Sequence, residues 1–529
     1  MRTGASRRSA ILEASKKIKQ SMGPLDLWKL KTTVAKKYGI AGVIKNSEIL
    51  VALPKKKRTK EMLELLRIRA TRTVSGVSVI AVMTKGDCPG TCIYCPRGEG
   101  AAQSYTGKEP ASLRAIQNNF DPYLQVGARI RQLQEIGHPV SKCELILMGG
   151  TFNAQPKKYQ SWFVQRCLDA MNGKKSKSLK DAQAKNENAG VRMVGMTVET
   201  RPDWAKARHV EALLELGATR VELGVQTLYD FVYRRVMRGH TVADVAEATQ
   251  ACKDSGLKVC YHMMPGLFAD KEMDVAIFKK MFDEPRFRPD MLKIYPCMVF
   301  RGTKLYELWK SGQYVPYSAE EAAEVIAEAK RHIPPYVRVM RVQRDIPAYL
   351  VDAGVKHSNL RQIVEEKLAQ KEIKCRCIRC REIGLKMLKE KIKPDLGAVE
   401  LKRATYDASG GTEIFLSFEE TKHDALIGLA RLRIPFKPFR PEIDARTALL
   451  RELHVYGGEL MVEERARAGA REVQHKGFGE RLLAEAERLA REEHGMRKLA
   501  VLSGVGARAY YYARGYKRDG VYVSKIIGL

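Results

Sequence analysis

Three cysteines within eight residues constrain this chain more than any other feature of its sequence. Cys88, Cys92 and Cys95 have the spacing C-x3-C-x2-C and follow an apolar run over 77–83 that predicts a strand. Three thiolates on one loop can hold three irons of a [4Fe–4S] cube, which normally takes four cysteines. The fourth iron is then open to a substrate or cofactor. The alternatives are reduced thiols without a role, or a structural zinc loop, which needs a fourth ligand and usually paired cysteines.

The spacing around Tyr94 resembles the signature of radical S-adenosylmethionine (SAM) enzymes. The resemblance implies that SAM chelates the open iron, and that an electron from an external donor releases a 5′-deoxyadenosyl radical. The protein then has to position the radical and exclude competing reactions. Gly149, Gly150 and Thr151 follow a second predicted strand over 143–148. Glycines there would let the backbone approach the methionine end of SAM, although a simple turn explains the pair equally well.

The length and composition indicate several domains, each with its own core. A chain of 529 residues with 45% hydrophobic residues is expected to form roughly two to four domains. No apolar run approaches the roughly 18 residues of a membrane span. The first residues lack the apolar core of a signal peptide. We therefore expect a cytoplasmic protein with no membrane partner, whose eleven cysteines serve metal binding or catalysis more than disulfides.

The positive charge is the second strong constraint. The formal net charge is +32, and residues 1–80 carry nineteen Lys or Arg against five Asp or Glu. A polyanionic partner is the natural inference, because contacts of Lys and Arg to phosphate give affinity without sequence choice. Residues 1–75 show helical spacing of apolar residues and are interpreted as a basic helical segment that binds RNA. A solvated charge run is the alternative.

Between about 76 and 345, short apolar runs alternate with helical patterns. Repeated βα units predict a parallel sheet covered by helices, either open or closed into a barrel, with ligands at the C-terminal ends of the strands. The predicted strands are 77–83, 143–148, 193–198, 219–225, 258–264 and 291–296. The predicted helices are 124–136, 157–170, 204–216, 242–255 and 272–283. Polar residues at strand ends that could line a pocket are Glu199, Thr200, Arg201, Gln226, His262 and Lys293.

A second cysteine triplet lies in residues 346–395, which we interpret as a connector. Cys375, Cys377 and Cys380 have the spacing C-x-C-x2-C, too tight for a disulfide ring system in a cytoplasmic protein. They match three ligands of a tetrahedral zinc site, which would take its fourth ligand from elsewhere. Candidates for that ligand are His357 and Cys297. A second Fe–S cluster and unligated thiols remain alternatives.

The character of the sequence changes towards the C-terminus. The candidate strands there are 412–418, 424–434, 448–456 and 498–505. Gln474, Gly477 and Gly479 form Q-x-x-G-x-G at the start of a predicted helix over 480–493. Free N–H groups at such a helix start can hold a pyrophosphate. The arrangement resembles the acetyl-CoA site of the GCN5-related N-acetyltransferases (GNAT), in which Tyr511 would donate a proton to a leaving thiolate; a packed aromatic is the alternative for Tyr511.

Taken together, the segments resemble the catalytic subunit of Elongator in its stand-alone, single-chain form. The supporting stretches are 104–110, 148–152, 199–203, 238–241, 262–265, 341–347, 451–457 and 503–506. The resemblance implies an α/β fold: a radical SAM partial (βα) barrel, then a mixed α/β GNAT domain, with a basic helical N-terminal segment. The expected domains are 1–75 (tRNA-binding), 76–345 (radical SAM), 346–395 (zinc connector) and 396–529 (GNAT).

The activity implied by the resemblance is modification of the wobble uridine in tRNA anticodons. SAM and acetyl-CoA are consumed, the deoxyadenosyl radical takes a hydrogen atom from the acetyl methyl, the carbon radical adds to C5 of the uracil, and thioester hydrolysis releases CoA. The implied cluster ligands are Cys88, Cys92 and Cys95. The implied acetyl-CoA contacts are Lys142, Glu452, Leu453, His454, Val455, Phe478, Gly479, Glu480 and Tyr511, of which Lys142 would bridge the two sites. The positive charge favours tRNA binding without other Elongator subunits.

Two rival readings come from other classes of protein. The first is a protein lysine acetyltransferase in which the Fe–S domain is structural. The second is a non-catalytic tRNA-binding scaffold with relic domains. SAM cleavage to 5′-deoxyadenosine under reduction would exclude the scaffold, and modification of the tRNA base would exclude the lysine acetyltransferase.

Overall fold

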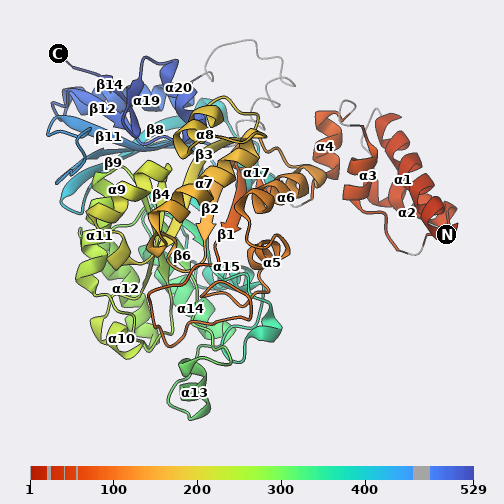
Figure 1. Ribbon diagram of the computed structural model, residues 1–529, viewed down its shortest axis with the longest axis horizontal. Coiled ribbons are helices and arrows are strands. Elements are labelled where there is room, and N and C mark those ends of the chain that lie inside the picture. The colour runs from red at the N-terminus through yellow and green to blue at the C-terminus, as the bar shows by residue number, and fades with distance from the viewer. Residues whose placement is uncertain are drawn as a thin grey trace.

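The computed structural model describes residues 2–20, 26–40, 42–54, 58–68, 70–456 and 477–528 (Figure 1). The basic N-terminal segment is helical there, as predicted. Its helices are α1 (Arg2–Gln20), α2 (Leu27–Lys37), α3 (Asn46–Ala52) and α4 (Lys60–Leu66). They pack around a small apolar core of their own, which includes Ala14, Val34 and Leu50. Figure 1 shows this bundle at one side of the molecule, where Arg67 Nε donates a hydrogen bond to the Gly137 carbonyl at 3.1 Å.

The central domain is a sheet of seven parallel strands whose order follows the chain. The strands are β1 (Ser78–Met83), β2 (Lys142–Met148), β3 (Arg192–Thr200), β4 (Arg220–Gln226), β5 (Lys258–Met263), β6 (Met291–Ile294) and β7 (Arg338–Arg341). Because each crossover turns in the same direction, the twisted sheet curls into an open half-barrel. The six predicted strands are confirmed, with ends that differ by at most two residues.

Helices cover the convex side of the half-barrel. They are α6 (Pro122–Glu135), α7 (Lys157–Asn172), α8 (Leu179–Asn186), α9 (Ala207–Leu216), α11 (Val242–Asp254), α12 (Lys271–Asp283) and α14 (Ala319–Ala329). Shorter helices on the connections are α5 (Pro110–Gln117), α10 (Asp230–Arg235) and α13 (Lys304–Lys310). The helix predicted over 204–216 starts at Ala207, because Pro202–Trp204 forms a 3-10 turn. Among the described residues, no helix combines the length and apolar character that a membrane crossing requires.

The connector carries α15 (Leu360–Gln370), α16 (Ile378–Arg381) and α17 (Ile383–Lys389). A second sheet of seven strands follows, in the order β13-β14-β12-β11-β10-β9-β8. Its strands are β8 (Val399–Ala408), β9 (Gly411–Glu420), β10 (Ala425–Ile434), β11 (Thr447–Val455), β12 (Lys498–Val501), β13 (Lys517–Asp519) and β14 (Tyr522–Ile526). The predicted strand over 498–505 is too long, because the chain leaves the sheet after Val501 and turns into a 3-10 segment at Val505–Ala507.

The second sheet is antiparallel except at its centre, where β11 and β12 run parallel. Their pairing ends at Leu450 and Val501. Because β11 continues to Val455 and β12 stops, the two strands part, and among the described residues no strand pairs with the last residues of β11 on that side. The long helix α19 (Phe478–Glu492) packs its leucines on the same sheet.

The two sheets are packed directly against each other. A Cβ added to Gly504 would lie 2.3 Å from the Val194 carbonyl carbon, so only glycine allows the loop after β12 to reach β3. Deeper in the interface, Arg451 Nη1 lies 2.7 Å from the carboxylate of Glu413, and Arg451 Nη2 lies 2.5 Å from that of Asp290. Asp290 belongs to the half-barrel domain, so this buried ion network joins the two sheets. Removing one partner from such a network leaves an uncompensated buried charge, which typically costs about 3–5 kcal/mol.

Candidate active site

A cavity of about 810 Å³ lies at the C-terminal ends of the half-barrel strands, and we call it the cysteine cavity. Cys88, Cys92 and Cys95 all line it, from the loop that follows β1. Gly150 faces the same loop with φ +73°, and a Cβ there would lie 3.1 Å from Cys88 Cβ. The glycine pair after β2 therefore lets the backbone lie directly beside the cysteine loop. Gly150 and Thr151 line the cavity.

Each thiol has a polar neighbour that suits a thiolate ligand. Arg238 Nη1 donates a hydrogen bond to Cys92 Sγ at 3.3 Å. Thr151 Oγ1 lies 3.2 Å from Cys88 Sγ, and Ser104 Oγ lies 3.1 Å from Cys95 Sγ. Burial opposes ionisation of Cys92, but the charge and hydrogen bond of Arg238 outweigh it and lower the thiol pKa. For Cys95 burial prevails, and its pKa is raised.

The spacing of these thiols fits a cluster better than a single ion. In the part of the chain that the structure describes, the Sγ atoms of Cys88, Cys92 and Cys95 do not all lie within 4.8 Å of one another. A tetrahedral zinc ion, with Zn–S bonds of about 2.3 Å, would bring its thiolates to within about 4 Å of each other. Three thiolates spread further apart on one loop suit three irons of a cube. The donor set and the adjoining cavity therefore fit a [4Fe–4S] cluster with room for a ligand on its open iron.

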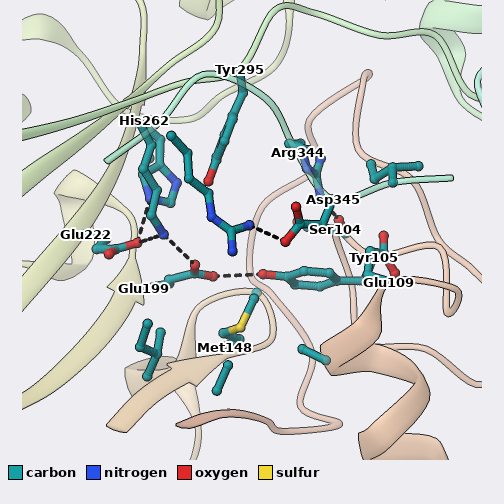
Figure 2. Close-up of a pocket in the computed structure, with 18 of the residues that line it drawn as sticks. Ser104, Tyr105, Glu109, Met148, Glu199, Glu222, His262, Tyr295, Arg344 and Asp345 are labelled. Carbon is teal, nitrogen blue, oxygen red and sulfur yellow. Dashed lines mark hydrogen bonds and ion pairs between the residues drawn. The ribbon is translucent and has the colours of Figure 1, made fainter. Parts of the chain in front are cut away.

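Buried charged residues line the cavity beyond the cysteine loop (Figure 2). Glu222 accepts hydrogen bonds from His262 Nε2 at 2.8 Å and from Lys293 Nζ. Lys293 Nζ also lies 3.5 Å from Glu199, which accepts a hydrogen bond from the Tyr105 hydroxyl at 2.8 Å. Although burial alone would raise it, the positive partners hold the pKa of Glu222 well below its usual range. The cavity thus has a fixed array of charged groups, which can orient polar substrates without rearranging.

A second cavity of about 850 Å³, the interface cavity, lies between the two sheets. It is bounded by the N-terminal ends of β2, β3 and β5, through Lys142, Arg192 and Lys258, and by the unpaired end of β11. Of the predicted acetyl-CoA contacts, it brings together Lys142, Glu452, Leu453, His454, Val455, Gly479 and Tyr511. These residues come from chain segments about 300 residues apart. Thr73 lines both cavities.

Some predicted residues lie elsewhere. Phe478 is buried in the core of the second sheet, with its ring centroid 4.8 Å from that of Phe418. Glu480 forms an ion pair with Arg514. Gly149 lies at the end of β2, but it does not belong to the lining of the cysteine cavity. Gln474 lies outside the described residues.

The interface cavity has the donors that a CoA thioester requires. Gly477 caps α19 without a side-chain hydrogen bond, so the positive dipole end of this 15-residue helix can face an anion. The exposed edge of β11 offers backbone groups to an extended pantetheine arm. Among the described residues, the buried hydroxyl of Tyr510 has no hydrogen-bond partner. These features fit a ligand that carries phosphates at one end and amides along its length.

The second cysteine triplet forms a compact group away from both cavities. The Sγ atoms of Cys375, Cys377 and Cys380 lie within 4.8 Å of one another, and those of Cys377 and Cys380 are 3.6 Å apart. This spacing matches one tetrahedral ion with bonds of about 2.3 Å. Lys330 Nζ lies 3.4 Å from Cys375 Sγ. Neither proposed fourth ligand, His357 or Cys297, belongs to the compact group.

The sequence analysis missed several residues that the structure places in the cysteine cavity. They are Tyr105, Glu222, Arg238, Arg341 and Arg344. A signal for one of them was present: β4 reads Arg-Val-Glu-Leu-Gly-Val-Gln, with a polar residue at three of its four alternate positions. Alternation in a strand that should be buried on both faces indicates a polar concave side. No comparable signal marks Arg238, which reaches Cys92 across 146 residues of sequence.

Family models match four segments of the chain. Residues 8–74 match the ELP3 N-terminal domain, 83–281 the radical SAM superfamily, 289–370 the radical SAM C-terminal domain, and 388–516 the acetyltransferase (GNAT) family. The radical SAM match implies SAM and a [4Fe–4S] cluster, and the GNAT match implies acetyl-CoA. The predicted fold class, a radical SAM half-barrel followed by a mixed GNAT sheet, is confirmed.

The similarity extends over nearly the whole chain. A tRNA uridine(34) acetyltransferase of Methanocaldococcus jannaschii is 52% identical over 492 residues, which cover 91% of this chain and 90% of that protein. The human Elongator complex protein 3 is 45% identical over 517 residues, covering 95% and 93%. A solved structure of the archaeal Methanocaldococcus infernus Elp3 with an N-terminal deletion has a TM-score of 0.76 at 48% identity and covers 85% of this chain and 99% of that one. This chain belongs to the family formed by the tRNA uridine(34) acetyltransferases and Elongator complex protein 3.

Proposed function

We propose that this protein carboxymethylates C5 of the wobble uridine in tRNA, with acetyl-CoA and SAM as cosubstrates. Its relatives carry the names tRNA uridine(34) acetyltransferase and Elongator complex protein 3, which support a reaction at uridine 34 of tRNA. One observation carries the proposal: the cysteine cavity and the interface cavity lie at the two ends of the same half-barrel strands and share Thr73. An enzyme that must bring an acyl methyl group to a radical needs two sites in that relation. We expect it to act in the cytoplasm and without other Elongator subunits.

In the cysteine cavity, Cys88, Cys92 and Cys95 would hold the [4Fe–4S] cluster. When bound, the cluster and SAM supply a deoxyadenosyl radical, after an external donor provides one electron. The residues of the chain position the reactants. Gly150 and Thr151 border the cysteine loop and offer backbone and hydroxyl groups there. The buried Glu222 array would orient polar groups of the nucleoside, because fixed charges in a site of low dielectric constant need no reorganisation during the reaction.

In the interface cavity, the start of α19 would hold the pyrophosphate of acetyl-CoA, and the unpaired end of β11 would align its pantetheine arm. Lys142 would contact the cosubstrate from the half-barrel side. Tyr511 lines the cavity, and burial raises the pKa of its phenol above the usual value. The phenol therefore stays protonated at neutral pH, as a proton donor to the released CoA thiolate has to be.

The tRNA would bind along the basic surface of the N-terminal helices and at the mouth of the cysteine cavity. Basic side chains that line this cavity are Lys108, Arg114, Arg129, Arg341 and Arg344. Chemistry on a base requires that the nucleotide leave the stack and enter a pocket. Contacts of this kind to phosphate predict affinity for tRNA that falls steeply with salt.

The geometry argues against the rival lysine acetyltransferase. A protein substrate would have to reach the thioester from the side where β11 and β12 part. Here Lys142, Arg192 and Lys258 of the half-barrel border the cavity on that side. The loop through Gly504 and Gly506 also touches the backbone at the start of β3. Among the described residues, the half-barrel therefore occupies the side from which an extended peptide would approach the site.

The compact triplet supports a further proposal, that Cys375, Cys377 and Cys380 hold a zinc ion. Lys330 beside them would balance the negative charge of the thiolates. The site is remote from both cavities, and its role would be to stabilise the connector, as structural zinc sites do.

Nucleoside mass spectrometry after anaerobic incubation tests the main proposal. The protein with reconstituted iron, reductant, SAM, acetyl-CoA and tRNA should form 5-carboxymethyluridine at the wobble position. Cys92→Ser should abolish the product, whereas Cys167→Ser, in a buried thiol on the outer helix α7, should retain it. Unmodified uridine from wild-type protein with an intact, reduced cluster would refute the function. Transfer of acetyl to protein lysines in the same incubation, unaffected by Cys92→Ser, would support the rival.

A further inference from the structure

A single layer of side chains separates the two cavities inside the half-barrel. Along β2, Lys142 lines the interface cavity and Ile146 lines the cysteine cavity. Along β5, Lys258 lines the interface cavity and His262 lines the cysteine cavity. Alternate residues of a strand face the same side, so on β2 and β5 one inward-facing residue, Glu144 and Cys260, lies between the two linings. Thr197 of β3 and Arg220 of β4 are paired in the sheet and both contact Glu144, and we call these four residues the polar layer.

The polar layer is centred on one ion pair, and all its members are buried except Glu144, which is partly buried. Arg220 Nη2 lies 2.6 Å from Glu144 Oε1, and Glu144 Oε1 accepts a hydrogen bond from Thr197 Oγ1 at 2.8 Å. Arg220 is 4% exposed, and Thr197 and Cys260 are fully buried. Glu222, on the cysteine-cavity side, lies 3.5 Å from Arg220 Nη2. The layer is therefore a charged partition with one cavity on each side.

Arg220 is incompletely bonded for a buried guanidinium. Its Nε has no hydrogen-bond partner among the described residues. Native proteins satisfy nearly all buried polar groups, and a donor left over at such a place calls for an explanation. The guanidinium fork is suited to bind an oxygen ligand through two N–H groups at once. A carbonyl or carboxylate oxygen that reached the polar layer could accept a hydrogen bond from this unused donor.

We propose that Arg220 is a positioning residue for the acyl group, which exchanges Glu144 for the acyl oxygen when the two-carbon unit crosses the polar layer. This inference rests on the proposed function. The reaction it serves moves one hydrogen atom: a C–H bond of the acetyl methyl breaks, a C–H bond of 5′-deoxyadenosine forms, and the unpaired electron stays on the former methyl carbon of the acyl group. In the part of the chain that the structure describes, the two linings share Thr73 alone and otherwise face each other across the polar layer, which is the route that we assign to the methyl group.

Deuterium transfer measures the crossing directly. Wild-type protein with tRNA, SAM, reductant and methyl-deuterated acetyl-CoA should yield 5′-deoxyadenosine that carries deuterium. In Arg220→Met, SAM cleavage should continue while the deuterated fraction falls by about tenfold or more, as expected for loss of a hydrogen bond from a charged group. The matched control is Arg166→Met, which breaks the Arg166–Asp169 pair on the outer helix α7 and should transfer deuterium like wild type.

The outcomes separate the inference from the function on which it rests. Deuterium that is missing from wild-type product would refute the proposed function. Deuterium transfer by Arg220→Met at the wild-type level would overturn the inference alone. Iron content and acetyl-CoA affinity report whether the variant is folded. If Arg220→Met is not folded, Arg220→Lys serves instead, because it retains the charge but not the guanidinium fork. This variant should show an intermediate loss of deuterium transfer.

Alkylation of Cys260 tests the polar layer without turnover. Cys260 lies in the layer, and Cys252, equally buried on α11, provides an internal reference. Glu144→Gln removes the charge that holds Arg220 and should let the layer open more often. Labelling of Cys260 by iodoacetamide, followed by peptide mass spectrometry, should then accelerate about tenfold relative to Cys252, since a charge-assisted hydrogen bond is lost. If Cys260 is labelled at the same rate in wild type and in Glu144→Gln, the ion pair between Arg220 and Glu144 does not hold the polar layer closed.

Discussion

The two cysteine triplets of this chain have similar sequences and different surroundings. Cys88, Cys92 and Cys95 border a cavity of about 810 Å³ and are too far apart to share one ion. The second triplet, through Cys377 and Cys380, has sulfurs 3.6 Å apart and lies outside both cavities. Spacings of C-x3-C-x2-C and C-x-C-x2-C differ by only two intervening residues, yet the first arrangement leaves space for a reactant and the second closes on itself.

The cationic side chains next to the two triplets also differ. Arg238 is buried in the half-barrel and donates a hydrogen bond to a single thiol, that of Cys92. Lys330 lies beside two thiols of the compact group, Cys375 at 3.4 Å and Cys380 at 3.9 Å. A directed hydrogen bond to one sulfur tunes a redox centre, whereas a point charge near several sulfurs neutralises a structural site. The comparison therefore predicts catalytic effects at the first triplet and effects on stability at the second.

The largest effect is expected for Cys92→Ser. Loss of a direct ligand should lower cluster occupancy and SAM cleavage by more than about 100-fold, since loss of groups that merely support metal ligands already costs 10–100-fold. Electron paramagnetic resonance of the reduced protein and the yield of 5′-deoxyadenosine measure the two quantities. Cys377→Ser should retain both signals. Loss of the cluster signal in Cys377→Ser would remove the functional distinction between the triplets.

The second effect is on stability. Cys377→Ser should lose the metal of the compact group and lower the free energy of unfolding of the connector by on the order of 4 kcal/mol, the scale of losing a structural metal. Thermal unfolding with and without a zinc chelator measures it: the chelator should lower the melting temperature of wild type and leave that of Cys377→Ser unchanged. A chelator effect of the same size in the variant would place the metal elsewhere.

The accuracy of the predictions made from the sequence depended on the kind of sequence signal. Strands with continuous apolar runs, such as β2 and β5, were predicted almost to the residue. β7 was missed because Arg-Val-Met-Arg has no such run. β8 was missed because most of its residues are exposed and four of its ten residues are charged, as is common in an edge strand. A local sequence pattern identifies a strand only when the composition of that strand is determined by burial rather than by its position in the sheet.

The candidate site shows a similar limit. The cysteine loop could be recognised from spacing alone, because all three ligands lie within eight residues. The interface cavity joins Lys142 to Tyr511, and no periodicity relates residues so far apart; their association came from the family resemblance. Arg220 and Glu144 were not singled out, although polar residues in buried strands marked both. Their role follows only from knowing that one cavity lies on each side of them.

A smaller effect should follow from Arg238→Met. Hydrogen bonds to cluster sulfurs raise the reduction potential, so removing the donor to Cys92 should make the cluster harder to reduce. For a one-electron couple, a tenfold change in the equilibrium constant corresponds to about 60 mV, and we expect a downward shift of about that size. Redox titration followed by paramagnetic resonance measures it. Lys330→Met, next to the compact group, is the matched control and should leave the potential unchanged; a shift there would mean that the sites communicate.

The smallest effect distinguishes thiols within the first triplet. In the iron-free protein, Arg238 lowers the pKa of Cys92, despite burial, and burial raises that of Cys95. Only the thiolate reacts with iodoacetamide, and its fraction rises as the pH passes the pKa of the thiol. As pH increases, Cys92 should therefore become reactive first and Cys95 later, which peptide mass spectrometry at a series of pH values would resolve. In Arg238→Met the advantage of Cys92 should disappear, because the main group that opposes the effect of burial on its pKa is then removed. If the order persists without Arg238, a group other than this guanidinium activates Cys92, and the contrast drawn between a directed donor and a diffuse charge fails.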